Sequence, residues 1–150
     1  MGELTHLRLN SMSTEAVAAV TALEDEVLKL PQVEIETEHA FHAGTYARTI
    51  KIPAGVVLTG AVIKIPTLLV FNGDAVVYRD DGPVRVTGHH VFLGAAGRKQ
   101  AFLAIGDTFL TMVFATNAAT IEEAEAEFTD DAARLMSRKD NAPNRMVMEA

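Results

Sequence analysis

The chain has a helical pattern of apolar residues near each end and a strand-like pattern between them. Over residues 13–30, valines and leucines recur every three or four positions, which places them on one face of a helix. Ser13 is a suitable N-cap, and Pro31 ends the pattern. We therefore expect an amphipathic helix whose apolar face packs against the protein's own sheet or against a neighbouring subunit.

Residues 33–116 alternate between apolar and polar side chains, which is the two-residue period of half-buried strands. Turn signals rich in Gly, Pro, Asn and Asp interrupt this pattern at intervals of about ten residues. Asn72–Gly73–Asp74 is one expected turn, and the segment GAAGRKQ at 94–100 contains another. About eight to ten short strands at this spacing predict a β-sandwich or a β-barrel.

After Asn117 the spacing becomes helical again. Thr120, followed three residues later by Glu123, has the signature of a capping box. The chain is thus expected to be mainly β, with five segments in this order: an N-terminal arm (1–12), an N-terminal helix (13–30), a β-barrel (31–118), a C-terminal helical segment (119–138) and a C-terminal tail (139–150). We expect contacts to order both ends, including contacts with neighbouring copies.

Composition narrows the possible functions. The chain has 150 residues, of which 49% are apolar, as in a single folded domain. It carries 13 Lys and Arg against 20 Asp and Glu, and its net charge of −7 argues against binding to nucleic acid or to an anionic membrane. The absence of cysteine excludes disulfides and thiolate chemistry. Because the N-terminus has no apolar core of signal-peptide length, we expect the protein in the cytoplasm.

Three motifs carry a resemblance to a known family. They are YARTIKIPAGVVLTG at 46–60, NGDAVVYRDDGPVRV at 72–86 and ATNAATIEEAEAEF at 115–128. From about residue 30 to residue 128, the chain resembles the small cupin-like proteins of tailed bacteriophages and prophages. The resemblance implies a cupin-like jelly roll or β-barrel with an N-terminal and a C-terminal helix.

The same resemblance implies where metal ligands would lie. Cupins typically hold a metal ion with two histidines and a glutamate from one hairpin and a third histidine from a later strand. The matching positions here are Ile63, Ile65, Thr67 and Gln100, none of which is a histidine or an acid. We therefore expect no catalytic residue, no metal and no cofactor, and a barrel interior filled by packed side chains.

His39, Tyr46 and Arg48 are the ligand candidates if the barrel contains a pocket. Tyr46 and Arg48 lie two residues apart and so share one face of a strand. An inward arginine in this position suits a ligand carboxylate or a sugar. The favoured interpretation is a structural ion pair with one of three glutamates on the preceding strand, namely Glu34, Glu36 and Glu38.

A metal site built from histidines is a second hypothesis. It would combine His39 and His42 with either His89 or His90, since adjacent residues on a strand point to opposite faces. The favoured interpretation is that these histidines are solvated or hydrogen-bonded near strand ends.

The resemblance favours a virion structural protein that decorates the capsid surface and is assembled in the host cytoplasm. Its expected partners are the major capsid protein and copies of itself, and it is not expected to be an enzyme. One alternative is a component of the phage tail or adaptor with a glycan- or protein-binding barrel. Another is a metal-independent cupin enzyme or small-molecule binder that uses His39, Tyr46 and Arg48.

Overall fold

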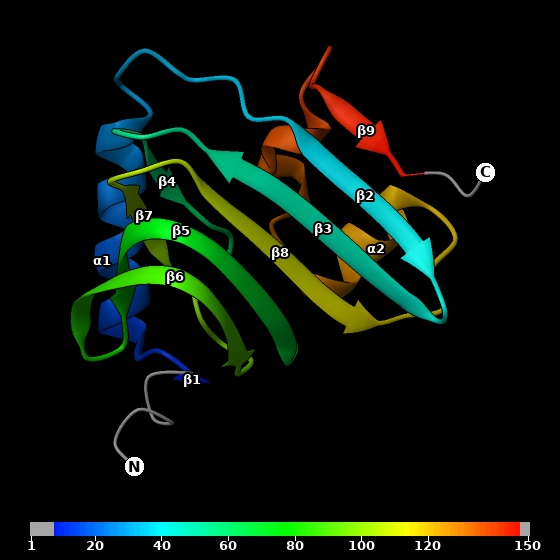
Figure 1. The fold of residues 1–150 in the computed structure, drawn as a ribbon, viewed down its shortest axis with the longest axis horizontal. Coiled ribbons are helices and arrows are strands. Elements are labelled where there is room, and N and C mark those ends of the chain that lie inside the picture. Colours follow the sequence, from blue (N-terminus) through cyan, green and yellow to red (C-terminus); the bar gives the residue numbers. More distant parts are fainter. Residues whose placement is uncertain (1–7, 148–150) are drawn as a thin grey trace.

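The computed structural model describes residues 8–147 and shows a mainly β protein with two α-helices, as expected (Figure 1). The elements, in chain order, are β1 (Arg8–Leu9), α1 (Thr14–Val27), β2 (Thr37–His42), β3 (Thr45–Ile52), β4 (Val57–Thr59), β5 (Thr67–Arg79), β6 (Gly82–Gly94), β7 (Ala101–Ala104), β8 (Thr108–Ala115), α2 (Ile121–Phe128), two 3₁₀ turns (Ala132–Arg134 and Met136–Arg138) and β9 (Asn144–Met146). Within residues 8–147, no helix is long and apolar enough to cross a membrane.

The strands form a curled sheet in the order β1-β6-β5-β8-β3-β2-β9, while β7 joins β5 to β4. The pairs β2–β3, β3–β8, β5–β8 and β5–β6 are all antiparallel. Figure 1 shows β8, β3 and β2 running side by side, with β5 and β6 curving away from them. This arrangement wraps the inward side chains around one interior, as the predicted jelly roll requires.

The expected turn at Asn72–Gly73–Asp74 is wrong, because β5 continues through it. One edge of β5 pairs with β6. The other edge pairs with β8 up to Asn72 and with β7 from Ala75. Gly73 therefore marks the corner where the strand passes from one part of the sheet to the other. Its φ of +155° is one that L side chains rarely adopt, which explains a glycine inside a strand.

We predict that Gly73→Ala lowers the free energy of unfolding by about 1–3 kcal/mol, from overpacking and backbone strain. A Cβ at this position would lie 2.6 Å from Thr108 Cα and 2.8 Å from the Asp107 carbonyl oxygen, and backbone atoms yield little. Urea unfolding measures the loss. Gly106→Ala is the matched control, since its Cβ would meet only Asp74 Cβ, at 3.6 Å. Equal losses in the two variants would contradict this account of the corner.

The core lies between the inward faces of the curled sheet and is closed by α2. Alternation along the strands sends every second residue inward. The buried apolar residues of this cluster are Leu9, Tyr46, Ile52, Leu69, Phe71, Ala75, Val77, Phe92, Phe102, Ala104, Leu110, Met112, Phe114, Ala124 and Phe128. Phe128 on α2 packs edge-on against Phe114 on β8, which fixes this helix to the sheet.

Both helices begin at the expected caps. The Ser13 hydroxyl accepts a hydrogen bond from the Ala16 amide at 3.1 Å, and the Thr120 hydroxyl accepts one from the Glu123 amide at 3.2 Å. α1 ends at Val27 rather than near residue 30. The expected helical segment at 119–138 is α-helical only over α2. After it the chain makes two short 3₁₀ turns, which lie across one end of the barrel.

The two described chain ends add strands to the protein's own sheet. β1 pairs in parallel with β6, and β9 pairs in parallel with β2, so each covers an edge strand. Contacts with neighbouring copies are therefore not needed to order these segments. The rest of the expected arm and tail, residues 1–7 and 148–150, lies outside the described residues.

Candidate functional site

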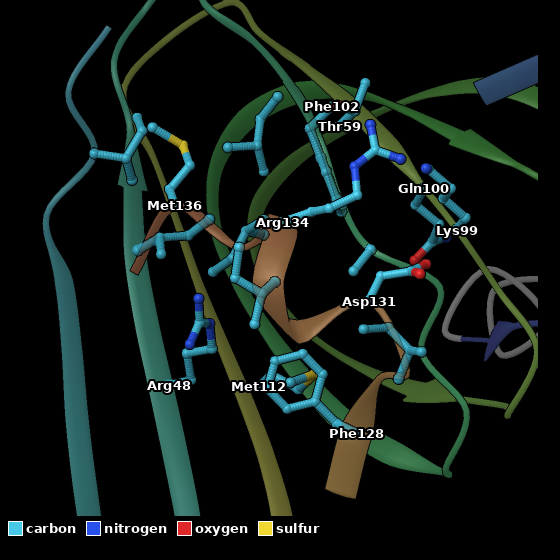
Figure 2. Close-up of a pocket in the computed structure, with 18 of the residues that line it drawn as sticks. Arg48, Thr59, Lys99, Gln100, Phe102, Met112, Phe128, Asp131, Arg134 and Met136 are labelled. Atoms are coloured by element: carbon cyan, nitrogen blue, oxygen red, sulfur yellow. The ribbon is translucent and has the colours of Figure 1, made fainter. Parts of the chain in front are cut away.

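A cavity of about 190 Å³ lies inside the barrel, next to α1 and the 3₁₀ turns (Figure 2). The prediction of a filled interior is therefore wrong. Ile63 and Gln100, at two of the positions matched to cupin metal ligands, line this cavity, while Thr67 is buried and Ile65 packs against the core. Space remains because the number of paired strands sets the diameter of the barrel, whatever the volume of the side chains inside it.

The cavity wall is mostly apolar, and its charged side chains come from α1, β3, the segment before β7 and the segment after α2. The apolar residues that line it are Ile35, Ile50, Leu58, Ala61, Ile63, Leu69, Phe102, Leu110, Met112, Phe128, Leu135 and Met136. Lys99 and Gln100 come from the segment before β7, and Arg134 reaches over from the 3₁₀ turns (Figure 2). An apolar body with a few convergent polar groups is typical of small-molecule sites.

Arg98 is the most unusual group in this wall. It is 2% exposed, and its guanidinium donates hydrogen bonds to the Ala95 carbonyl at 2.7 Å and to the Thr67 hydroxyl at 2.6 Å. Its Nε is buried and has no hydrogen-bond partner. Burial lowers the pKa of Arg98 to about 10, so the group still carries its charge at neutral pH.

Three charged side chains meet beside the cavity. Glu24 of α1 lies 3.4 Å from Lys99 Nζ and 2.7 Å from an Arg134 terminal nitrogen. The Thr59 hydroxyl also donates to Glu24, at 3.0 Å. One carboxylate therefore serves two cations here, and this ion cluster attaches α1 to the barrel.

The three predicted ligand candidates do come together, in a chain of hydrogen bonds. Arg48 donates to the Tyr46 hydroxyl at 3.4 Å, and that hydroxyl lies 2.6 Å from His39 Nδ1. His39 Nε2 lies 2.8 Å from Asn144 Oδ1 on β9. Because this oxygen only accepts, Nε2 carries the proton, and in the neutral ring Nδ1 accepts from the Tyr46 hydroxyl. His39 therefore uses both ring nitrogens within the fold.

Burial acts on both ends of the His39–Tyr46 pair. It lowers the pKa of His39 below its ordinary value, and the nearby Arg48 charge acts in the same direction. Burial also raises the pKa of Tyr46. Both groups are thus held in their neutral forms near pH 7.

Glu125 of α2 is the centre of this network, and it is fully buried. It pairs with Arg48 at 2.7 Å and with Arg138 at 2.5 Å, and it accepts a hydrogen bond from the Ser137 hydroxyl. Burial alone would raise the pKa of Glu125, but the hydrogen bonds from Ser137, Arg138 and Arg48 outweigh it and hold the pKa below its usual range.

The expected ion pair between Arg48 and a glutamate of the preceding strand is wrong in its partner. Glu34, Glu36 and Glu38 alternate out of phase with Thr37 and His39, which point inward, so their carboxylates lie on the other face of the sheet. Arg48 points inward and meets Glu125 of α2, 77 residues away in sequence.

The proposed histidine metal site does not form within the described part of the chain. His39 is buried against Tyr46, whereas His90 packs beside Phe71 and Phe92 and lies 2.7 Å from the Thr87 carbonyl oxygen. Among residues 8–147, no group of three or more His, Cys, Asp or Glu is placed to hold a metal ion.

Sequence reasoning overlooked Arg98 and Glu125 as members of sites. Arg98 lies in GAAGRKQ, which indicated only a turn, and Glu125 lies in an acidic run that is typical of a solvated helix face. A usable signal existed for Glu125: it falls between Ile121 and Phe128 on the face that the helical period turns toward the barrel.

Comparison with known proteins relates the fold, and only the fold, to proteins of established structure. No protein-family model and no curated protein sequence matches the chain. Salicylate 1,2-dioxygenase from Pseudaminobacter salicylatoxidans is similar over 76% of this chain, with 16% identity and a TM-score of 0.50, although the match spans 35% of that enzyme.

Two smaller proteins are similar in structure. A cupin superfamily protein from Desulfitobacterium hafniense matches 73% of this chain and 99% of its own length, with 14% identity and a TM-score of 0.47. A protein with a double-stranded beta-helix domain from Klebsiella pneumoniae matches 63% of this chain and 84% of its own, with 12% identity and a TM-score of 0.47. The chain has a mainly β jelly-roll fold with two helices, which it shares with the matched part of the salicylate 1,2-dioxygenase.

Proposed function

We propose that the chain is a non-enzymatic structural protein of a bacteriophage virion, a decoration protein on the capsid surface. The observation that supports this is an apolar outer face on β6, β5 and β8. We call it the outer sheet face, and its residues are Leu68, Val70, Val91, Leu93, Phe109 and Val113. Leu68, Val91, Leu93 and Phe109 are each 41–48% exposed. Contiguous exposed apolar surface of this kind is typical of sites for other proteins.

The register brings these side chains together. Leu68 lies opposite Leu93 on β6 and opposite Val113 on β8, so one apolar row crosses three strands. An exposed apolar row of this kind suits burial against a capsid subunit or a second copy of the chain. The proposed partners are the major capsid protein and further copies of the chain. Stable contacts with them would bury about 1,200–2,000 Å² in total.

The inner network supports a structural role over catalysis. His39 uses both ring nitrogens inside the protein, and Arg48 is neutralised by Glu125. These candidates hold β2, β3, α2 and β9 together, so a reaction that used them would require the network to open.

The test is incorporation into particles of the virus that encodes the chain. We expect the protein at hundreds of copies per particle, and we expect particles that lack it to break at lower temperature or lower ionic strength. A Leu68→Glu/Leu93→Glu variant should fold but fail to rebind such particles. Ile105→Glu, at a residue 44% exposed in the β7–β8 turn, should rebind them normally.

Other outcomes decide against the proposal. Labelled protein on the tail in electron micrographs would favour the tail or adaptor alternative. Absence from particles would overturn the virion role altogether, and normal rebinding of the double variant would exclude the outer sheet face as the contact.

The cavity favours a second candidate function, that of a metal-independent small-molecule binder. This candidate depends on the interior of the barrel and the virion role on its outer face, so the two are tested separately.

A further inference from the structure

We propose that the barrel cavity binds a small apolar carboxylate, with Arg98 supplying the opposite charge. This inference rests on the second candidate function, the small-molecule binder, and is independent of the virion role.

The first argument is the lack of a counter-charge at Arg98. The two hydrogen bonds of its guanidinium go to neutral oxygens, those of Ala95 and Thr67. Within residues 8–147, no carboxylate lies within ion-pair distance of Arg98. A buried charge is costly unless an opposite charge accompanies it, and proteins nearly always provide one. An anion in the adjoining cavity would supply it.

The contrast with Arg48 sharpens this argument. Arg48 lines the same cavity, but Glu125 of the protein itself lies 2.7 Å away. The chain therefore neutralises one inward arginine internally and leaves the other without an opposite charge among the described residues. The site for an anion accordingly lies at the Arg98 end of the cavity.

The neighbours of Arg98 leave its charge in excess. Lys99 and Arg134 share Glu24, and a second carboxylate, Asp131, also lines the cavity, so these four charges balance and the charge of Arg98 remains. Gln100 is 7% exposed and lines the cavity, and its side-chain amide has no hydrogen-bond partner among the described residues. An amide donor beside a guanidinium is a suitable pair of groups for a carboxylate.

The remaining wall defines the rest of the ligand. It is built from aliphatic side chains, Phe102, Phe128 and Met112, which favour an apolar body over a sugar or a free phosphate. A protein cavity of about 150 Å³ accepts benzene, and this one measures about 190 Å³. A ring or short chain with a single carboxylate therefore fits.

The experiment compares benzoate with benzamide, which has the same shape but no charge. Isothermal titration calorimetry at neutral pH with the full chain should show benzoate binding at least about tenfold more tightly than benzamide, since a charge-assisted contact differs from a neutral one by at least this factor. Inorganic phosphate should not bind, because it has no apolar body.

Two variants locate the site. Arg98→Met keeps the length of the side chain, and it should reduce benzoate affinity to that of benzamide. Arg85→Met is the matched control, since Arg85 is exposed and paired with Asp74 on the outside, and it should leave both affinities unchanged. If Arg98→Met does not fold, the comparison of benzoate with benzamide on the unaltered protein still decides the question.

The outcomes separate this inference from the function on which it rests. Equal binding of benzoate and benzamide would retain the small-molecule binder and overturn the carboxylate. Binding of neither compound at millimolar concentration would count against both. Loss of benzoate binding in Arg85→Met but not in Arg98→Met would place the anion outside the barrel and overturn the inference.

Discussion

Glu125→Gln should lower the free energy of unfolding by about 3–5 kcal/mol, the cost of removing one partner from a buried ion pair. Glutamine keeps the shape of the side chain but leaves Arg48 and Arg138 facing a neutral group. Chemical denaturation followed by circular dichroism measures the loss. Glu122→Gln changes an exposed carboxylate one helical turn away, and it should cost less than about 0.5 kcal/mol.

A double variant separates the charge effect from simple packing. In Glu125→Gln/Arg48→Met, one of the unpaired cations is also removed, so part of the stability should return. The single variant Arg48→Met completes the cycle. If the double variant loses as much free energy of unfolding as the two single variants together, the Arg48–Glu125 pair contributes no coupling, and the account of Glu125 as the centre of the network is wrong.

Acidification should destabilise the protein in two stages, and the first depends on His39. Its folded-state pKa is lowered by burial, so below pH 6.5 the unfolded state takes up a proton before the folded state does. Stability therefore falls as the pH drops from about 6.5 to the folded-state pKa, with a slope of up to about 1.4 kcal/mol per pH unit. Unfolding curves recorded between about pH 8 and about pH 5 measure this stage, because this range extends more than one pH unit to each side of an ordinary histidine pKa.

The second stage depends on Glu125. Because its folded-state pKa lies below 4.5, its contribution is complete above that pH and is lost as the pH falls through the folded-state value. His39→Gln should flatten the first stage and leave the second in place. His89→Gln alters an exposed histidine and should change neither. A first stage that persists in His39→Gln would assign it to another group.

Local sequence patterns predicted the elements well because they depend on short-range chemistry. The caps at Ser13 and Thr120 are contacts within one turn of helix, and alternation along β2 and β3 follows from the geometry of a single strand. The wrong prediction of a turn at Gly73 also came from a local pattern. A glycine between Asn and Asp usually marks a turn, and only the change of partner strand shows that it marks a corner within β5.

The candidate site was only partly predictable. The shared face of Tyr46 and Arg48 follows from their spacing, but the partner of Arg48 comes from a helix 77 residues later. No local rule indicates such a pairing. The empty ligand positions led to the prediction of a filled barrel, which is wrong because Ile63 and Gln100 line open space.

The sequence alone thus determined a mainly β chain with a helix near each end, and the facing directions of its strand residues, because propensity, capping and alternation act over a few residues. Only the tertiary structure decided which charges are neutralised and where space remains. Arg48 meets Glu125, Arg98 meets no carboxylate among residues 8–147, and a cavity lies between them. The reason is that burial and charge pairing depend on atoms that the closure of the barrel brings together. The separation of two residues along the sequence does not indicate whether they become neighbours in space.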